Sequence, residues 1–508
     1  MTTASITPSQ DSADGPRDAP IEHVDVLIVG AGLSGIGAAC RVRTDAPRKS
    51  FLVLEARDAI GGTWDLFRYP GVRSDSDMFT LSYRFRPWDG ETSIADGWSI
   101  RRYIEETARE YRVTERIRFH HRVVSAEWSS EDARWTVTAE RTDTGQAVRF
   151  TCSWMSVAAG YYRYDQGFRP AFPGEEDFAG TFVHPQAWPE DLDYEGKRIV
   201  VIGSGATAIT LVPSLTDRAE HVTMLQRTPS YVVSLPGTDP VARTLRKRLP
   251  AATAYRIVRA KNVLLTTLMY QFSRRRPAAM KALVRKGLIK QLPAGYDVDT
   301  HFSPPYDPWD QRLCVVPDGD LFRALGSDKA SIVTDRIAGF TETGIRLESG
   351  KEIPADIVVT ATGLRVLPLG GMTLSVDGEK VDLSSRFSYK GMMFTGVPNL
   401  AMIFGYTNAS WTLRADLINR YACRLLTFMD GAGYVSATPV PPPDGRSAPF
   451  VELSSGYIRR SLDELPRQGS RSPWRVYQNY LRDRRLMGRG RLEDEGMTFQ
   501  PAPGGGRQ

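Results

Sequence analysis

The chain has 508 residues, more than one hydrophobic core usually supports, so we expect two or three domains. Hydrophobic residues make up 41% and charged residues 24%, as in ordinary globular proteins, and no apolar run is long enough to span a bilayer. The four cysteines are too widely spaced to indicate a disulfide framework, a redox-active pair or a metal site. They favour a reducing, cytoplasmic setting. The cysteines are Cys40, Cys152, Cys314 and Cys423.

Both ends of the chain have compositions typical of disorder. Residues 1–20 are rich in Ser, Thr, Asp and Pro and contain no apolar run, which predicts a disordered tail and not a signal peptide. Residues 501–508 are predicted to be a second disordered tail.

The net charge of +6 comes from residues 241–292, which hold fourteen Lys and Arg and no Asp or Glu. Because the rest of the chain is acidic on balance, we do not expect nucleic-acid binding. Apolar residues recur at helical spacing in this segment, and Pro250 and Pro277 interrupt it, which favours a basic helical insertion. A helix of this composition also suits an anionic membrane, so a weak peripheral membrane contact through 241–292 stays open.

A dinucleotide-binding signature follows the first apolar run, residues 24–30. Its sequence is Gly30-Ala-Gly32-Leu-Ser-Gly35; a predicted helix over 34–43 and a second apolar run over 51–54 come next. In this strand–turn–helix–strand order the glycines allow a tight turn, close approach to a pyrophosphate, and close helix packing. Glu55, 25 residues after Gly30, can accept hydrogen bonds from ribose hydroxyls, which favours FAD.

The same pattern occurs a second time, with one change. Residues 197–202 predict a strand, Gly203-Ser-Gly205-Ala-Thr-Ala208 opens a helix, and residues 221–226 predict the next strand. Arg227 and Thr228 stand where the first unit has Glu55. An arginine there can pair with a 2′-phosphate, which favours NADP(H) over NAD(H).

These units predict an α/β fold with two Rossmann-like dinucleotide-binding domains, one for FAD and one for NADP, and a helical insertion. Strand patterning returns over residues 331–363, with a hairpin over 345–353 and an apolar strand over 355–363. We therefore expect a discontinuous FAD-binding domain, residues 21–160 and 364–500. The NADP-binding domain, residues 161–240 and 293–363, lies within it and is itself interrupted by 241–292.

Between the two glycine turns lies Phe178-Ala-Gly180-Thr-Phe-Val-His184-Pro-Gln-Ala-Trp188-Pro189. It matches the F-x-G-x-x-x-H-x-x-x-W-P fingerprint of type I Baeyer–Villiger monooxygenases, which the chain resembles from about residue 22 to about residue 497. Four sequence segments most resemble the EthA-type subgroup of FAD-containing monooxygenases. They are YDPWDQRLC, ATGL, GYTNASWTL and SLDELPRQGSR-x-PWR. In the family the fingerprint couples domain movement to NADP binding, so His184 is not assigned to acid–base catalysis.

The resemblance also implies an active site. Residues 61–75, GGTWDLFRYPG-x-R-S-D, are similar to the family's flavin-facing loop, in which the aspartate matching Asp75 orients an arginine. Tyr306-Asp-Pro-Trp-Asp-Gln-Arg312-Leu-Cys314 aligns with the segment that carries this arginine, making Arg312 the candidate. A permanently charged cation in a dry pocket stabilises a peroxyanion and a substrate carbonyl. Many members have Lys before this arginine; here Gln311 leaves more of the NADP selectivity to Arg227.

The predicted catalytic residues are Arg312 and Asp75, and no metal site is predicted. The predicted FAD-binding residues are Gly30, Gly32, Ser34, Gly35, Glu55, Thr63, Trp64, Asp65, Leu66, Asp75 and Val123. The predicted NADP-binding residues are Arg73, Ser74, Gly203, Ser204, Gly205, Ala206, Thr207, Ala208, Ile209, Arg227 and Thr228.

The resemblance implies an NADPH- and O2-dependent flavoprotein monooxygenase that converts ketones to esters or lactones through a C4a-peroxyflavin. It also implies S-oxygenation of sulfides or thioamides. Two alternatives stay open: an S/N-oxygenating flavin monooxygenase and a non-catalytic FAD/NADP redox sensor. The expected partners are a ketone or sulfur substrate and O2 in a cytoplasmic protein; the particular substrate and the oligomeric state do not follow from the sequence.

Overall fold

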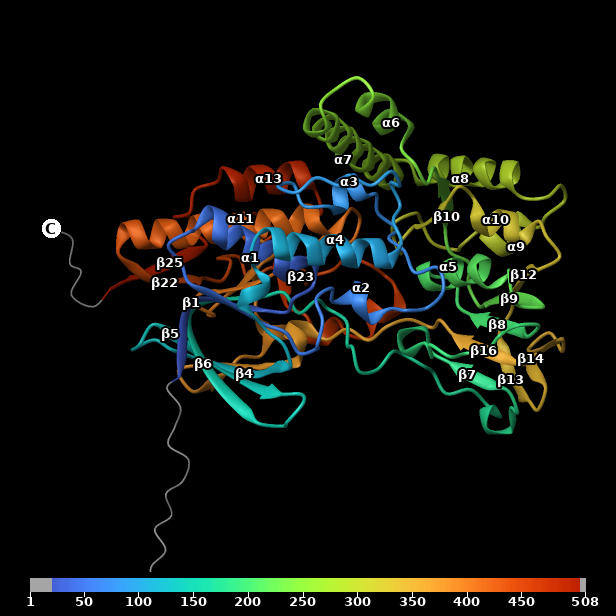
Figure 1. Ribbon diagram of the computed structural model, residues 1–508, viewed down its shortest axis with the longest axis horizontal. Helices are drawn as coiled ribbons and strands as arrows, with labels where there is room; N and C mark the ends of the chain where they lie inside the picture. The colour runs from blue at the N-terminus through green and yellow to red at the C-terminus, as the bar shows by residue number, and fades with distance from the viewer. Residues whose placement is uncertain (1–20, 503–508) are drawn as a thin grey trace, which may run out of the picture.

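The computed structural model describes residues 21–502. Two β-sheets lie along the long axis of the molecule, and each carries helices (Figure 1). This is the predicted α/β fold with two Rossmann-like units. None of the helices in residues 21–502 is long and apolar enough to cross a membrane.

The larger sheet has nine strands, and the first glycine turn follows one of its parallel strands. In spatial order the strands are β18 (Glu379–Lys380), β17 (Thr373–Val376), β4 (His121–Ser129), β5 (Arg134–Arg141), β6 (Ala147–Val157), β1 (Glu22–Val29), β2 (Phe51–Leu54) and β3 (Ile117–Arg118), with β21 (Leu400–Met402) also pairing with β6. Strands β1, β2 and β3 are parallel to one another, and they join the antiparallel strands β4, β5 and β6 because β1 also pairs with β6 in parallel. Strands from both ends of the chain therefore build one sheet.

The smaller sheet has five strands, all parallel. Its strands are β12 (Ala330–Thr334), β9 (His221–Gln226), β8 (Arg198–Ile202), β16 (Ile357–Thr360) and β7 (Thr181–Val183). The central strands are fully buried and rich in Val and Ile, as expected of a sheet covered on both faces. The predicted hairpin is also present, as β14 (Gly344–Leu347) and β15 (Glu352–Pro354) pairing antiparallel.

Helices on the larger sheet form the main core of the molecule. α1 (Leu33–Asp45) packs against α11 (Trp411–Ala432) and α4 (Gly97–Glu110), and their apolar side chains join those of β1 and β2. The smaller sheet is covered by α5 (Ala206–Leu215), α9 (Val298–Phe302) and α10 (Asp320–Leu325). Four further short helices pack on the side of the larger sheet: α2 (Thr63–Leu66), α3 (Met78–Leu81), α12 (Gly456–Arg459) and α13 (Tyr480–Gly488).

The basic segment forms three helices along one edge of the molecule (Figure 1). They are α6 (Pro240–Arg246), α7 (Ala251–Arg275) and α8 (Pro277–Gln291). Pro250 directly precedes α7 and Pro277 is the first residue of α8, positions where proline is tolerated because those N–H groups have no partner within the helix.

The remaining strands form small sheets: β10 (Val232–Leu235) with β11 (Cys314–Pro317), β13 (Ile337–Thr341) with β14, β19 (Ser388–Tyr389) with β20 (Met393–Phe394), β22 (Tyr434–Pro439) with β25 (Met497–Pro501), and β23 (Ser447–Pro449) with β24 (Arg467–Gly469). The tail predicted from residue 501 begins too early, because Pro501 ends β25 opposite Tyr434 and the Ala502 N–H donates to Gly433. The other residues of both predicted tails lie outside the described residues.

Candidate active site

The first glycine turn brings three backbone segments together at the carboxyl end of β1. Gly30 has a φ of +102°, a conformation that favours glycine, and a Cβ atom on Gly35 would lie 1.8 Å from the Gly30 carbonyl oxygen. Gly32 forms a bridge to Gly61 in the following glycine loop. The turn that leads into α1 therefore has no side chain at Gly30 or Gly32, which leaves the helix N-terminus accessible to a phosphate.

A cavity of about 650 Å³ extends from this turn. The sequence-predicted residues that line it are Gly30, Gly32, Ser34, Glu55, Thr63, Trp64, Ser74, Asp75, Val123, Ala206 and Arg312. The predicted residues that do not line it are Gly35, Asp65, Leu66, Arg73, Gly203, Ser204, Gly205, Thr207, Ala208, Ile209, Arg227 and Thr228. The structure thus gathers eight of the eleven predicted FAD residues around one cavity and leaves most of the NADP set outside it.

Glu55 holds the turn together from the end of β2. Its carboxylate accepts hydrogen bonds from the Ala31 N–H at 2.6 Å and the Arg57 N–H at 2.9 Å. Burial raises the pKa of Glu55, and these two bonds offset part of that rise. Its position at the cavity wall fits the ribose-binding role predicted for it.

Asp65 and Leu66 point elsewhere because they lie in the single turn of α2, whose first residues, Thr63 and Trp64, face the cavity. The Asp65 carboxylate is buried and forms ion pairs with Arg57 and with Arg101, the latter at 2.8 Å. Its contacts anchor the glycine loop to α4.

Arg312 and Asp75 meet at the cavity wall. The Arg312 guanidinium donates from Nε to Asp75 Oδ2 at 2.6 Å and from Nη2 to Asp75 Oδ1 at 2.8 Å. A further contact runs from Nη1 to the Thr407 carbonyl oxygen at 3.4 Å. Burial lowers the pKa of Arg312, but the charge and hydrogen bonds of Asp75 outweigh it and raise that pKa above its ordinary value. The result is a fixed, permanent cation.

Three tyrosines next to this pair were not predicted. Tyr161 and Tyr162 line the cavity and share a hydrogen bond between their hydroxyl groups, and the Tyr162 ring lies near that of Tyr457. Burial raises the pKa of all three, so they stay neutral hydrogen-bonding groups. The available signal was the tyrosine-rich segment Tyr161–Tyr164, which begins four residues after the end of β6.

Trp411 and Tyr406 were missed in a similar way. Both line the cavity; the Trp411 indole N–H donates to Ser34 Oγ at 2.7 Å, and the ring stacks on Tyr161. Both residues belong to the segment GYTNASWTL. This segment indicated the family, but no role was predicted for either residue from the sequence.

The second glycine turn lies at the carboxyl end of β8. Gly203 has a φ of +141°, and a Cβ atom there would lie 2.4 Å from the Ala361 carbonyl oxygen. Gly205 and Ala206, at the start of α5, are exposed, whereas Ala208 and Ile209 are buried beneath them. Since Ala206 also lines the main cavity, this helix N-terminus opens toward the same space.

The other predicted NADP residues differ in their surroundings. Ser204 Oγ donates to the Thr228 carbonyl oxygen at 2.9 Å, and Arg227 is exposed and makes no ion pair within residues 21–502. Arg73 instead pairs with Asp320, and Ser74 bonds locally to Ser76. Arg227 is thus the side chain of this set most available to an anionic ligand.

The fingerprint segment crosses the edge of the smaller sheet through β7. A Cβ atom on Gly180 would lie 2.5 Å from the Asp356 carbonyl oxygen, so glycine is needed there. The Gln186 side chain donates to the carbonyl oxygens of Arg163 and Tyr164 at 2.9 and 2.8 Å. The segment therefore contacts the connection between the two sheets, and none of its residues lines the cavity.

Comparisons with known proteins agree with this arrangement. A flavin-binding monooxygenase-like family matches residues 94–276, and an NAD(P)-binding Rossmann-like domain matches residues 28–86. The FAD-containing monooxygenase EthA of Mycobacterium tuberculosis is 54% identical over 488 residues, covering 95% of this chain and 99% of the relative.

The corresponding EthA of Mycolicibacterium smegmatis is 52% identical over 480 residues, covering 94% of this chain and 97% of the relative. An oxidized steroid monooxygenase bound to NADP has the same fold, with a TM-score of 0.74 and 22% identity, covering 94% of this chain and 100% of that structure. The chain belongs to the family of EthA-type FAD-containing monooxygenases.

Proposed function

We propose that the protein is an NADPH- and O2-dependent Baeyer–Villiger monooxygenase. It converts a ketone, O2, NADPH and a proton into an ester or lactone, NADP+ and water, and it also oxygenates sulfides or thioamides. The observation that carries this proposal is the Arg312–Asp75 pair in the wall of the cavity that begins at the first glycine turn.

The residues around that cavity fit FAD. The glycine turn leaves the N-terminus of α1 accessible to a pyrophosphate, Glu55 is positioned for ribose hydroxyls, and Trp64 supplies a flat apolar surface. When bound, FAD supplies the redox chemistry that activates O2. We assign its domain to residues 21–160 and 364–500.

The second turn fits NADPH, within a domain of residues 161–240 and 293–363. The exposed start of α5 suits the pyrophosphate, and Arg227 suits the 2′-phosphate. Because Ala206 lines the FAD-side cavity, a nicotinamide bound at this helix can reach the flavin site. Gln311 carries no positive charge, so Arg227 bears most of the preference for the phosphate.

In the reaction Arg312 stabilises negative charge that develops on the transferred oxygen and on the substrate carbonyl. Asp75 fixes the guanidinium plane through two hydrogen bonds, and Nη1, which also contacts the Thr407 carbonyl oxygen, keeps a second N–H for the substrate side. The neutral Tyr161 and Tyr162 donate hydrogen bonds within the same wall and, with Trp411, exclude water.

The test is product balance in the purified, FAD-loaded protein. With a linear long-chain ketone, NADPH and O2, we expect one ester formed for each NADPH oxidised and little hydrogen peroxide. Stoichiometric peroxide without ester contradicts the proposal. Oxygenation of a sulfide but of no ketone identifies an S/N-oxygenating monooxygenase instead, and bound cofactors without substrate-stimulated NADPH consumption identify a redox sensor.

A further inference from the structure

Exposed apolar side chains are concentrated on the three basic helices. Twelve large hydrophobic residues within residues 21–502 are strongly exposed, and eight of them lie between residues 241 and 289. The eight are Val241, Ile257, Leu264, Leu265, Leu268, Phe272, Leu283 and Ile289. A cluster of this kind on a soluble surface marks an interaction site.

Five of the eight form a stripe along one side of α7, which is interrupted by Lys261 in its ion pair with Asp239. Ile257, Leu264, Leu265, Leu268 and Phe272 are between 40% and 57% exposed. At about 100° per residue they occupy an arc of roughly 100° on the helix surface. The helix therefore presents a largely apolar side outward between Ile257 and Phe272.

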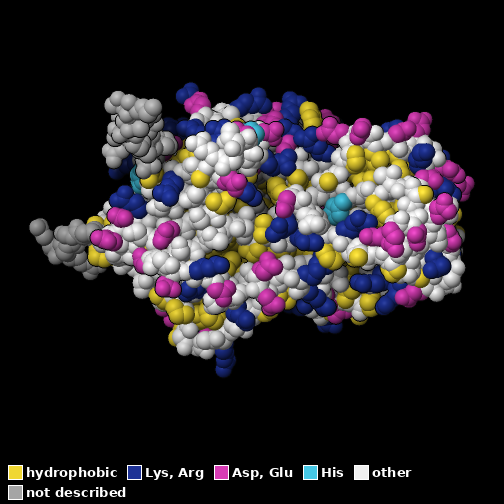
Figure 2. Space-filling model, turned by 90° about the horizontal axis from the view of Figure 1, so that it is seen from below, with side chains coloured by type: hydrophobic (Ala, Val, Ile, Leu, Met, Phe, Trp, Pro, Cys, Tyr) yellow, Lys and Arg dark blue, Asp and Glu magenta, His cyan; other side chains and the backbone are white. Residues whose placement is uncertain are grey.

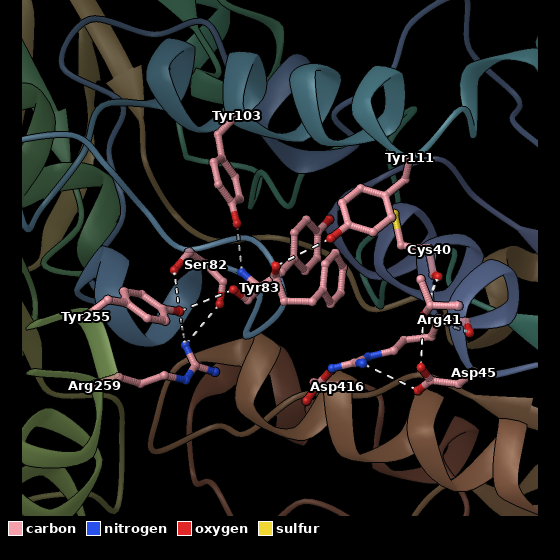
Figure 3. Close-up of polar contacts among 12 residues, drawn as sticks. Cys40, Arg41, Asp45, Ser82, Tyr83, Tyr103, Tyr111, Tyr255, Arg259 and Asp416 are labelled. Atoms are coloured by element: carbon pink, nitrogen blue, oxygen red, sulfur yellow. Dashed lines mark hydrogen bonds and ion pairs between the residues drawn. The ribbon is translucent and has the colours of Figure 1, made fainter. Parts of the chain in front are cut away.

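The opposite face of α7 is fixed to the body of the protein. Figure 3 shows Tyr255 and Arg259 pointing from α7 toward Ser82 and Tyr83. The buried Arg259 guanidinium donates to the carbonyl oxygens of Phe79, Thr80 and Ser82, the first at 2.6 Å. These buried hydrogen bonds fix the rotation of α7 about its own axis. The apolar stripe therefore cannot turn inward to join the hydrophobic core.

The segment around the stripe carries fourteen Lys and Arg and no acidic residue. Within residues 21–502, several of these basic side chains form no ion pair. They are Arg243, Lys247, Arg248, Arg256, Arg275, Arg276, Lys286 and Lys290. The face seen from below in Figure 2, opposite the edge that carries α6 and α7 in Figure 1, mixes acidic and basic side chains in the ordinary way.

We propose that helices α6, α7 and α8 dock the protein on an anionic lipid bilayer surface, with the α7 stripe among the acyl chains and the basic side chains at the headgroups. A second copy of this chain would bring another strongly positive surface against the first, whereas an anionic bilayer complements both the charge and the apolar face. This inference goes beyond the proposed function and does not depend on it.

Docking through α7 also brings lipid close to the active site. The same helix borders a small second cavity, through Val263, Thr267 and Tyr270. Ala409 lines both this cavity and the main one. A substrate that partitions into the bilayer would therefore be concentrated beside the cavity that takes it.

The test is co-sedimentation of the FAD-loaded protein with vesicles. We expect binding to phosphatidylcholine vesicles that contain phosphatidylglycerol, weakening with added salt, and little binding to pure phosphatidylcholine. Leu264→Asn combined with Leu268→Asn should weaken binding at least tenfold, and Arg275→Gln combined with Arg276→Gln by about fivefold for each charge.

The matched control is Leu481→Asn, an equally exposed leucine on α13, which should bind like the wild type. Flavin content and NADPH oxidation should be unchanged in all variants, which separates lost docking from lost folding. The proposal is overturned if the wild type does not bind the anionic vesicles or if Leu481→Asn weakens binding equally. The proposal is also overturned if the protein does not bind vesicles but self-associates, and if the α7 variants abolish that self-association.

Discussion

The Arg312 guanidinium forms a two-pronged hydrogen-bonded ion pair with the Asp75 carboxylate, although 237 residues separate them in the chain. Asp75 follows the glycine loop of the larger sheet, and Arg312 lies two residues before β11, beside the smaller sheet. The pair therefore joins the two halves of the molecule at the wall of the cavity. Any relative movement of the halves therefore acts directly on the position of the Arg312 guanidinium.

Asp75→Asn should slow oxygenation because it removes the charge that holds Arg312 while keeping the size of the side chain. Loss of a charge-assisted bond of about 1.5–3 kcal/mol corresponds to a roughly 10- to 100-fold lower rate of product formation. Product formation per bound flavin measures this. Asp58→Asn, at an exposed site, serves as the control, and an equal loss there would point to a general effect of carboxylate removal.

Arg227→Ala should raise the KM for NADPH by about tenfold or more while leaving the KM for NADH nearly unchanged. The expected reason is loss of the cation that pairs with the 2′-phosphate, a contact that NADH cannot make. Steady-state kinetics with both nucleotides measure the difference. Arg134→Ala, on β5 of the larger sheet, should change neither value; equal rises for NADPH and NADH in Arg227→Ala would refute the assignment.

Arg259→Met should destabilise the attachment of α7, because three buried carbonyl oxygens lose their common donor. We expect a loss of about 2–4 kcal/mol, seen as a Tm lower by several degrees in thermal unfolding. Arg256→Met, one turn away at an exposed position, should change the Tm by little more than experimental error. Equal Tm values for the two variants would show that Arg259 does not anchor the helix.

The four cysteines should resist alkylation in the folded protein. All are buried, and burial raises the pKa of Cys40, Cys314 and Cys423 to about 12 and that of Cys152 further still. Because the raised pKa keeps each thiol protonated at mildly alkaline pH, the reactive thiolate is scarce. Mass spectrometry after iodoacetamide treatment should find no adduct on native protein and four after denaturation; rapid labelling before denaturation would contradict this.

The local features of the fold were predictable from the sequence because they depend on neighbouring residues. The turns at Gly30 and Gly203, the flanking strands and the hairpin over 345–353 combine glycine geometry with apolar periodicity, and both act over a few positions. The pairing of β22 with β25 was not predictable, since it joins segments some 60 residues apart and depends on tertiary packing. For the same reason the predicted tail starts at Pro501, although this residue ends β25.

The same distinction between local and long-range features applies to the candidate site. The approach of Arg312 to Asp75 was expected only through resemblance, because no local pattern relates positions so far apart. Tyr161, Tyr162 and Trp411 gave no signal beyond their aromatic character, which equally suits a hydrophobic core. Asp65 is the opposite case, because a local motif predicted that it contacts the cofactor. In the structure it lies in the single turn of α2, and its carboxylate pairs with Arg101.

The most direct measurement of the central claim compares wild type and Arg312→Ala in two separate half-reactions. The variant should bind FAD and let NADPH reduce it anaerobically, because Arg312 is not needed to hold either nucleotide. After O2 is admitted with a ketone present, the wild type should yield ester, whereas the variant should release hydrogen peroxide and essentially no ester. Ester formation by the variant at a rate near that of the wild type would contradict the catalytic role of Arg312.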